Sequence, residues 1–134
     1  MKREIKFRAW NKTEGWIDTE FCIHADGCVY QDARKRWDIS DTAIEAAYDY
    51  LIIEQFTGLK DKNGVDIYES DKVRVTMVGG YEDFIVGYSS EKARFVLIDE
   101  FGGDGWGFDD SNEYLVIGNI HENPELIKKQ FMSI

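Results

Sequence analysis

Apolar side chains recur at every second position over much of this 134-residue chain, and this period of two constrains the fold more than any other feature. Val73, Val75 and Met77, for example, stand at alternate positions with polar residues between them. Successive residues of a β-strand point to opposite faces, so the pattern indicates strands that bury one face. The sequence therefore predicts a mainly β fold.

The second half of the chain carries this pattern in short segments with turn signals between them. The predicted strands are Lys72–Val78, Phe84–Tyr88, Arg94–Ile98 and Tyr114–Ile117. Short strands at this spacing favour a small curved sheet or a partly open barrel.

The first half predicts an N-terminal hairpin lobe. Residues 4–10 alternate cleanly, and a turn at 11–15 leads to a returning strand that starts at Trp16. A second antiparallel pair is predicted from Phe21–His24 and Cys28–Gln31, which the Asp-Gly turn of residues 25–27 joins.

Two helices complete the predicted α+β, mainly β fold. Residues 42–49 suit a helix that Asp41 caps, and the following run 50–56 reads as a buried strand, with a continuing helix as the alternative. Asn123 and Pro124 have the residue types of a cap and a first helical position, so a short C-terminal helix is predicted.

The polar tract between residues 60 and 64 predicts a turn, because Asn63 and Gly64 both tolerate positive φ. A calcium-binding loop is the alternative, but the spacing of the oxygen ligands does not fit such a loop. Gly64 comes one oxygen ligand too early, and Ser70 stands where the loop needs a glutamate. Ser70 and Asp71 form a second predicted corner.

Three blocks of sequence carry a resemblance to a known family: MKREIKFRAWNK at the start, TGLKDKNGVDIYESDKV in the middle and VIGNIHENPEL near the end. Together they resemble the YopX family of bacteriophage and prophage proteins. The resemblance implies one YopX-like domain over residues 1–134, with an N-terminal lobe 1–56 and a barrel-like lobe 57–134 as its subdivision. The family pattern has Gly where this chain has Ser70. The resemblance implies no established activity, and it supplies no catalytic residues.

Composition and charge limit the classes of partner. The net charge is −10, which opposes binding to nucleic acid, because affinity for phosphates comes largely from Lys and Arg. No apolar run reaches the roughly 18 residues of a membrane span, and the basic N-terminus lacks the apolar stretch of a secretory signal. We therefore expect a cytoplasmic protein, which for a phage protein means the cytoplasm of the bacterial host.

The strongest candidates for metal ligands are Cys22, His24 and Cys28, with His121 as a fourth. Thiolate and imidazole suit zinc, but structural zinc sites usually present two pairs of ligands, and only one loose cluster is present. We expect no cofactor, and we expect Cys22 and Cys28 to be reduced thiols.

The Gly-rich loop 99–110 contains five carboxylates and no Lys or Arg. It shows no regular spacing of cation ligands and lacks the Lys-Ser/Thr of a phosphate-binding loop. Exposed aromatic residues in such a loop favour a protein contact. The predicted contact residues are Trp106, Phe108, Asp109 and Asp110.

The leading hypothesis for function is a non-catalytic accessory protein that works through protein contacts and self-associates as a homo-oligomer, because edge strands in small sheets invite pairing with another copy. A host protein is the other expected partner, as in the alternative hypothesis of an acidic inhibitor of a host nucleic-acid-binding protein. A metal-dependent enzyme is the third.

Overall fold

The computed structural model describes residues 3–13, 15–17, 22–23, 29–30, 51–99, 102, 105–109 and 111–124, with the backbone alone at 22–23 and 29–30. The chain forms two compact units. The larger contains Met1–Lys6 and Glu54–Ile134, and the smaller contains Phe7–Ile53.

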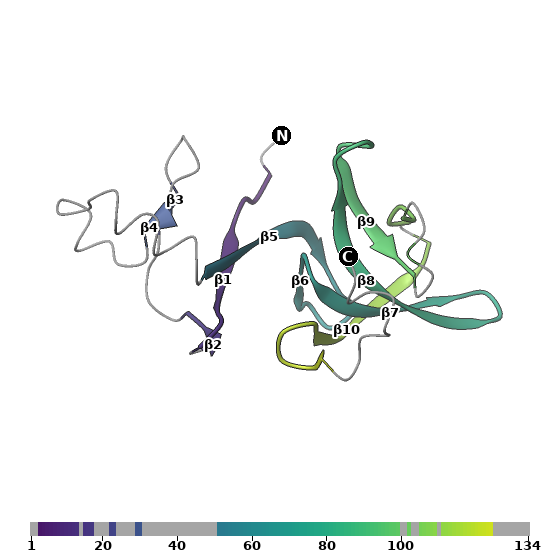
Figure 1. Ribbon diagram of the computed structural model, residues 1–134. Helices are drawn as coiled ribbons and strands as arrows, with labels where there is room; N and C mark the ends of the chain where they lie inside the picture. The colour runs from purple at the N-terminus through teal and green to yellow at the C-terminus, as the bar shows by residue number, and fades with distance from the viewer. Residues whose placement is uncertain are drawn as a thin grey trace. The chain divides into compact units, whose positions relative to one another are not determined.

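The described residues form ten β-strands and contain no α-helix (Figure 1). The strands are β1 (Phe7–Asn11), β2 (Gly15–Trp16), β3 (Cys22–Ile23), β4 (Val29–Tyr30), β5 (Leu51–Lys60), β6 (Asp66–Tyr68), β7 (Asp71–Met77), β8 (Gly80–Ser89), β9 (Arg94–Ile98) and β10 (Glu113–Asn119). The predicted helices over 42–49 and after Pro124 fall outside the described residues.

The strands form three sheets, with the orders β2-β1-β5-β6, β10-β7-β8-β9 and β3-β4. The pairs β1–β2, β3–β4, β5–β6, β7–β8, β8–β9 and β7–β10 are all antiparallel. The prediction of a mainly β, antiparallel fold is therefore confirmed. No helix in the part of the chain that is described has the length and apolar character to cross a membrane.

The smaller unit contains the predicted N-terminal hairpin. Trp10 of β1 pairs with Trp16 of β2, and their rings meet edge to face with centroids 5.0 Å apart. The Arg8 guanidinium lies 4.3 Å from the Trp16 ring centre. Ala9 and Leu51 form its buried core.

In the larger unit, β7 to β10 form the predicted curved sheet, a curled half-barrel that runs in Figure 1 from the teal of β7 through green to the yellow-green of β10. Val73 and Val75 of β7 are buried, as their alternation predicts, whereas Met77 is 37% exposed near the end of the strand. Ile67 of β6 and residues of the half-barrel form one core. The half-barrel residues are Val73, Val75, Phe84, Val86 and Leu97.

β5 is a strand of ten residues, Leu51–Lys60, so the predicted strand over 50–56 is confirmed from Leu51 onward. β5 continues past the predicted end at Phe56. Its pairing with β6 is irregular between Phe56 and Lys60, and Gly58, with a φ of 91°, lies within this irregular stretch. The predicted turn follows. Gly64 adopts φ 82° and donates its N–H to the Asp61 carbonyl at 3.0 Å.

The second corner joins β6 to β7. Ser70 has a φ of 71°, so the corner adopts the left-handed conformation although this chain lacks the family's glycine. The Ser70 N–H donates to the Val86 carbonyl, and the Ser70 carbonyl accepts from the Ile120 N–H. The buried Asp71 carboxylate accepts bonds from the Tyr68 N–H and the Asn119 side chain. This corner therefore ties β8 and the end of β10 to the start of β7.

Candidate protein-contact edge

The two outer strands of the half-barrel, β10 and β9, differ in what lies beside them. Beside β10 lies the turn of residues 61–65. The Lys62 N–H donates to the Tyr114 carbonyl at 2.9 Å, and the Val116 N–H donates to Asp61 Oδ2 at 3.0 Å. An edge strand normally presents these groups to another chain. Here the turn satisfies them, so we call this side the closed edge.

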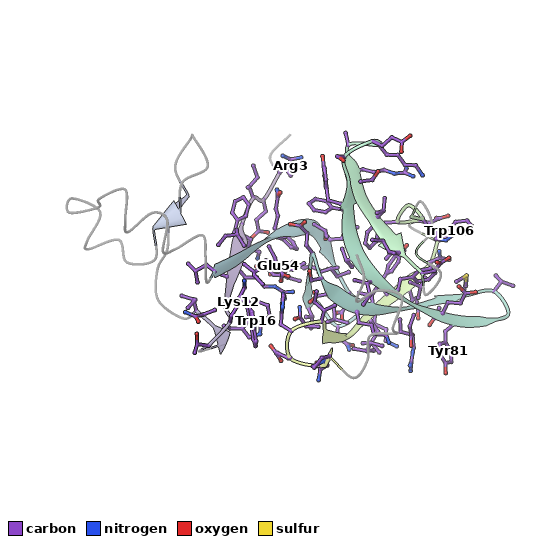
Figure 2. The ribbon with its side chains drawn as sticks, viewed as in Figure 1. Arg3, Lys12, Trp16, Glu54, Tyr81 and Trp106 are labelled. Atoms are coloured by element: carbon purple, nitrogen blue, oxygen red, sulfur yellow. The ribbon has the colours of Figure 1, made fainter. Side chains whose placement is uncertain are left out.

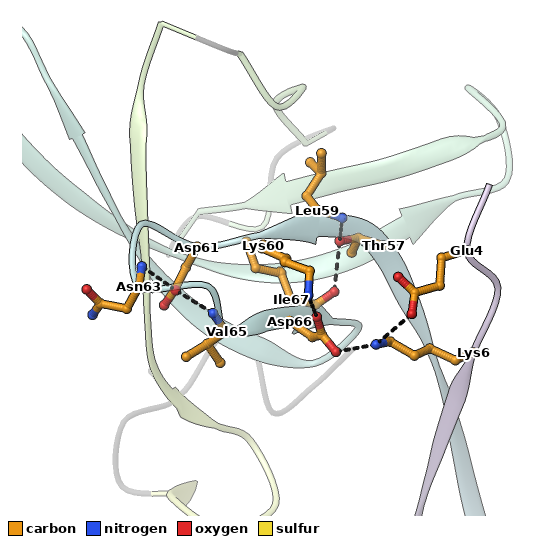
Figure 3. A network of polar contacts seen from close by, with 10 residues as sticks. All are labelled: Glu4, Lys6, Thr57, Leu59, Lys60, Asp61, Asn63, Val65, Asp66 and Ile67. Carbon is orange, nitrogen blue, oxygen red and sulfur yellow. Dashed lines mark hydrogen bonds and ion pairs between the residues drawn. The ribbon is translucent and has the colours of Figure 1, made fainter. Parts of the chain in front are cut away.

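The Asp61 side chain is the centre of the closed edge. Its Oδ1 accepts the N–H groups of Asn63 and Val65 at 2.8 and 2.9 Å, which Figure 3 shows, and its Oδ2 accepts the N–H of Val116. Burial alone would raise the pKa of this carboxyl, but the bonds from Val116, Val65 and Asn63 outweigh that effect and lower it. The Asp61 carboxylate therefore accepts a hydrogen bond from β10 that the backbone of a neighbouring strand would otherwise accept.

Lys6 holds the neighbouring β5–β6 hairpin against the N-terminal segment. Its ammonium group pairs with Asp66 of β6 and with Glu4, and Lys60 adds a second pair to Asp66 at 3.2 Å (Figure 3). The hydrogen bond from Lys6 lowers the pKa of the Asp66 carboxyl. Lys6 also lies 4.6 Å from the ring centre of Phe56.

Among the described residues, Trp106 is the main-chain neighbour of β9 on its outer side. Leu97 and Trp106 form an isolated antiparallel bridge, in which each N–H donates to the other's carbonyl at 2.7 and 2.8 Å. Because Leu97 directs its backbone groups away from β8, Phe95, two residues earlier, directs its own groups the same way. No described residue bonds to Phe95 on that side. We call this half of β9 the open edge.

Trp106 lies at the inner end of the open edge, where Figure 2 labels it. Its side chain is 62% exposed, and its indole N–H donates to Asp99 Oδ2 at 3.4 Å. Gly105 precedes it with φ 89°, and a Cβ at this glycine would lie 2.8 Å from Val96 Cβ. The close approach of this loop to β9 therefore requires glycine.

Phe108 and Asp109 anchor the same loop. Phe108 packs against the core, with its ring centre 5.2 Å from that of Tyr114. The Tyr114 hydroxyl accepts the Asp109 N–H and donates to the Asp109 carbonyl. The backbone N–H and hydroxyl of Ser111 bond to the Asp109 carboxylate and lower its pKa. Of the predicted contact residues, Trp106 and Asp109 are exposed and Phe108 is half-buried, and Asp110 lies outside the described residues.

The predicted metal ligands do not form a described cluster. Cys22 is placed in β3 by its backbone only, and His24 and Cys28 lie outside the described residues. His121 Nε2 lies 2.8 Å from Oε2 of the buried Glu54. Within the described ranges, no three His, Cys, Asp or Glu side chains are grouped to hold a metal.

Sequence reasoning missed Asp61 and Phe95. Asp61 looked like an ordinary turn residue, because its bond to Val116 spans 55 positions. Phe95 lies in a predicted strand, but the alternation of side chains does not say which strand ends at an edge. Only the order β10-β7-β8-β9 identifies the edge.

These features define a small protein built mainly of antiparallel β-strands, in which a curled sheet has one closed and one half-open edge. The family model described as "YopX protein" matches residues 6–128, and the chain belongs to the YopX family.

Two solved structures are similar to it. Protein EF1440 from Enterococcus faecalis is 26% identical, with a TM-score of 0.51, and the match covers 95% of this chain and 100% of that one. Protein yopX from Bacillus subtilis is 18% identical, with a TM-score of 0.54, and the match covers 91% of this chain and 97% of that one. The latter likeness concerns the fold alone. A search of curated proteins found no match.

Proposed function

We propose that this is a non-catalytic, phage-encoded accessory protein that works in the host cytoplasm and self-associates through the open edge of β9. The phage setting rests on the three sequence blocks that resemble the family. The buried position of the His121–Glu54 pair supports a structural rather than a catalytic use of that histidine, because its side chain is only 12% exposed.

The observation that carries the proposal is the direction of the Phe95 backbone groups. One hydrogen-bond donor and one acceptor face outward beside the exposed Trp106, in a sheet whose other edge is closed. Adding a strand there would satisfy both groups, as in other cases of edge pairing.

Two copies can pair by a two-fold axis beside Phe95. In an antiparallel pair centred on this residue, each Phe95 N–H donates to the carbonyl of its counterpart, and the two four-stranded sheets become one. Trp106 bounds the open edge at Leu97, so the paired segment is short. We therefore expect a weak dimer, with a dissociation constant on the order of micromolar.

The charge of the chain sets the salt dependence of this dimer. Each copy carries a net charge of −10, so two copies repel each other at low ionic strength. Salt screens that repulsion, and self-association should therefore strengthen as salt is added.

Sedimentation velocity over a range of protein concentrations tests the proposal. Phe95→Pro removes the outward N–H but spares the β8–β9 hydrogen bonds, because proline is tolerated where the N–H faces solvent. Phe95→Ala is the matched control, which loses the same ring and keeps the N–H. We expect the alanine variant to dimerise and the proline variant to stay monomeric.

Two results would refute self-association through this edge. One is a wild-type protein that remains monomeric at about 100 μM, well above the expected micromolar constant. The other is a proline variant that keeps its fold, as judged by circular dichroism, and dimerises as well as the alanine variant.

The second candidate is an acidic inhibitor of a basic host protein that binds nucleic acid, and the net charge of −10 favours it. Its signature is the opposite salt dependence. A complex between an acidic and a basic protein weakens as salt is added. Pull-downs from host lysate at low and high salt would therefore separate it from self-association.

A further inference from the structure

β8 is the longest strand of the half-barrel, and β9 covers only part of its outer side. β9 pairs with β8 from Ile85 to Ser89. Among the described residues, Gly80 to Phe84 have β7 as their one neighbouring strand. The edge that begins on β9 therefore continues along the first half of β8. Figure 1 shows this end of the β7–β8 hairpin projecting from the sheet, and we call residues 74–83 the arm.

The backbone of the arm directs hydrogen-bonding groups outward at two residues. Leu97 of β9 points its groups away from β8, so its partner Val86 points its own groups toward β7. The bond from the Ser70 N–H to the Val86 carbonyl agrees with this direction. Because the direction alternates along a strand, the N–H and carbonyl of Tyr81 and Asp83 point to the side of β9. No described residue bonds to these outward groups.

The two faces of the arm differ in charge. On one face, the Arg74 guanidinium donates to the Asp83 carboxylate at 2.9 and 3.2 Å and lies 4.3 Å from the ring centre of Tyr81. The charges of this pair cancel, and the Tyr81 side chain, labelled in Figure 2, is 60% exposed. On the other face, Glu82 is exposed and forms no ion pair with a described residue. The uncompensated charge of the arm is therefore the carboxylate of Glu82.

A second carboxylate lies at the inner end of the arm. Asp99 directly follows Ile98, the last residue of β9, and Ile98 pairs with Ile85 of β8. A strand added along the arm would continue the line of β9, so one of its ends would lie near Asp99. The whole chain, with a net charge of −10, also favours a positively charged partner.

We propose that the arm binds an extended, basic segment of a partner protein, which adds a strand beside Tyr81 and Asp83. Strand addition takes its affinity from main-chain hydrogen bonds and its specificity from alternate side chains. A Lys or Arg of the added strand would lie beside Glu82, and opposite charges on neighbouring strands attract. The next side chain would lie on the other face, against the exposed ring of Tyr81. This contact does not depend on self-association at Phe95.

Fluorescence anisotropy with labelled peptides and the full-length protein tests the proposal. The probe is acetyl-Thr-Lys-Val-Lys-Val-Lys-Thr-amide, which places its lysines on one face of a strand. One control peptide has Glu in place of each Lys. The other keeps the lysines and carries N-methyl groups on two adjacent central residues, which removes an N–H from each edge. We expect the lysine peptide to bind about tenfold tighter than either control, and to bind more weakly as salt is added.

Protein variants separate the main-chain contact from the charge contact. Tyr81→Pro removes an outward N–H near the start of β8, where proline is tolerated, and Tyr81→Ala is the matched control that keeps the N–H. We expect the proline variant to bind the lysine peptide about tenfold more weakly than the alanine variant, with both folds checked by circular dichroism.

Glu82→Gln should weaken binding of the lysine peptide about threefold. Glu91→Gln is its control, because it removes a carboxylate from the turn at the far end of β8. Phe95→Pro should bind the peptide as the wild type does, so a failure of self-association and a failure of this proposal are distinguishable.

Hydrogen exchange followed by NMR locates the contact. The amides of Tyr81 and Asp83 should exchange more slowly when the lysine peptide is added. The proposal is overturned if these amides do not respond, if either control peptide binds as tightly as the lysine peptide, or if Glu91→Gln weakens binding as much as Glu82→Gln. Protection of the two amides in concentrated protein without peptide would assign the arm to a second copy and would also overturn it.

Discussion

The closed and open edges of the half-barrel show how one side chain decides whether a strand is available for pairing. At β10, the carboxylate of Asp61 and the N–H of Lys62 occupy the positions that a neighbouring strand would take. At β9, Trp106 occupies one such position, and the outward N–H and carbonyl of Phe95 bond to no residue in the described ranges. The same sheet is therefore protected on one side and receptive on the other.

This difference limits the number of copies that can pair through the sheet. A sheet with two open edges would add copies at both and grow without end, whereas one open edge closes on itself after two copies. The Asp61 turn is thus expected to limit pairing through this sheet to two copies.

The largest effect should come from opening the closed edge with Asp61→Ala. The substitution leaves the N–H groups of Asn63, Val65 and Val116 without their acceptor. Each lost bond at a buried group costs about 1 kcal/mol or more, so we expect a loss of about 3 kcal/mol in the free energy of unfolding. Urea denaturation measures it, and an unchanged midpoint would show that the closed edge does not depend on this carboxylate.

Asp61→Asn is the finer version of that test, because it keeps the side-chain shape and one acceptor oxygen. The lowered pKa of Asp61 means that its stabilising effect is present above the pKa of the unfolded chain and is lost as pH falls through the folded pKa. Below about pH 4, the usual region for Asp, the stability of the wild type should fall more steeply than that of Asp61→Asn. Parallel stability profiles for the two proteins would contradict this role.

Gly105→Ala should disturb the open edge by a smaller amount. The new methyl group would lie 2.8 Å from Val96 Cβ at a φ of 89°, so the loop that carries Trp106 must move away. We expect a loss of about 2 kcal/mol, since strain and overpacking each cost 1–3. Thermal unfolding measures the loss. Gly102→Ala is the control, because Gly102 has a φ of 66° but no neighbour within 4 Å. Equal losses of stability in the two variants would mean that backbone strain alone, and not the contact with Val96, destabilises Gly105→Ala.

The smallest effect, and the one of opposite sign, is expected from Ser70→Gly. Ser70 holds a φ of 71°, which costs a non-glycine residue about 1 kcal/mol. Glycine removes that cost and increases the entropy of the unfolded chain, so a gain of a few tenths to about 1 kcal/mol should remain. Chemical denaturation resolves it, and a destabilised variant would mean that the serine side chain contributes more than the strain costs.

The sequence predicts the strands of the half-barrel well, because each strand buries one face and its apolar and polar residues therefore alternate. The predicted range 94–98 matches β9, and Val73 and Val75 are buried as expected. β8 is longer than predicted, since it begins at Gly80 in a hairpin where exposed residues carry no pattern.

The candidate site could be predicted only in part. The loop predicts Trp106 as a contact residue, and the structure places its exposed side chain beside Leu97 of β9. The contact itself stays a prediction. The roles of Asp61 and Phe95 depend on which strands lie side by side in the sheet. Such long-range proximity leaves no local signal in one sequence.

Hydrogen exchange of individual backbone amides, followed by NMR in dilute and in concentrated protein, tests the contrast between the edges most directly. The amides of Leu97 and Val116 should be protected at both concentrations, and the Phe95 amide should exchange fast in the dilute sample and slow in the concentrated one. A Phe95 amide that is protected in dilute protein, or that exchanges equally fast at every concentration, would contradict the account.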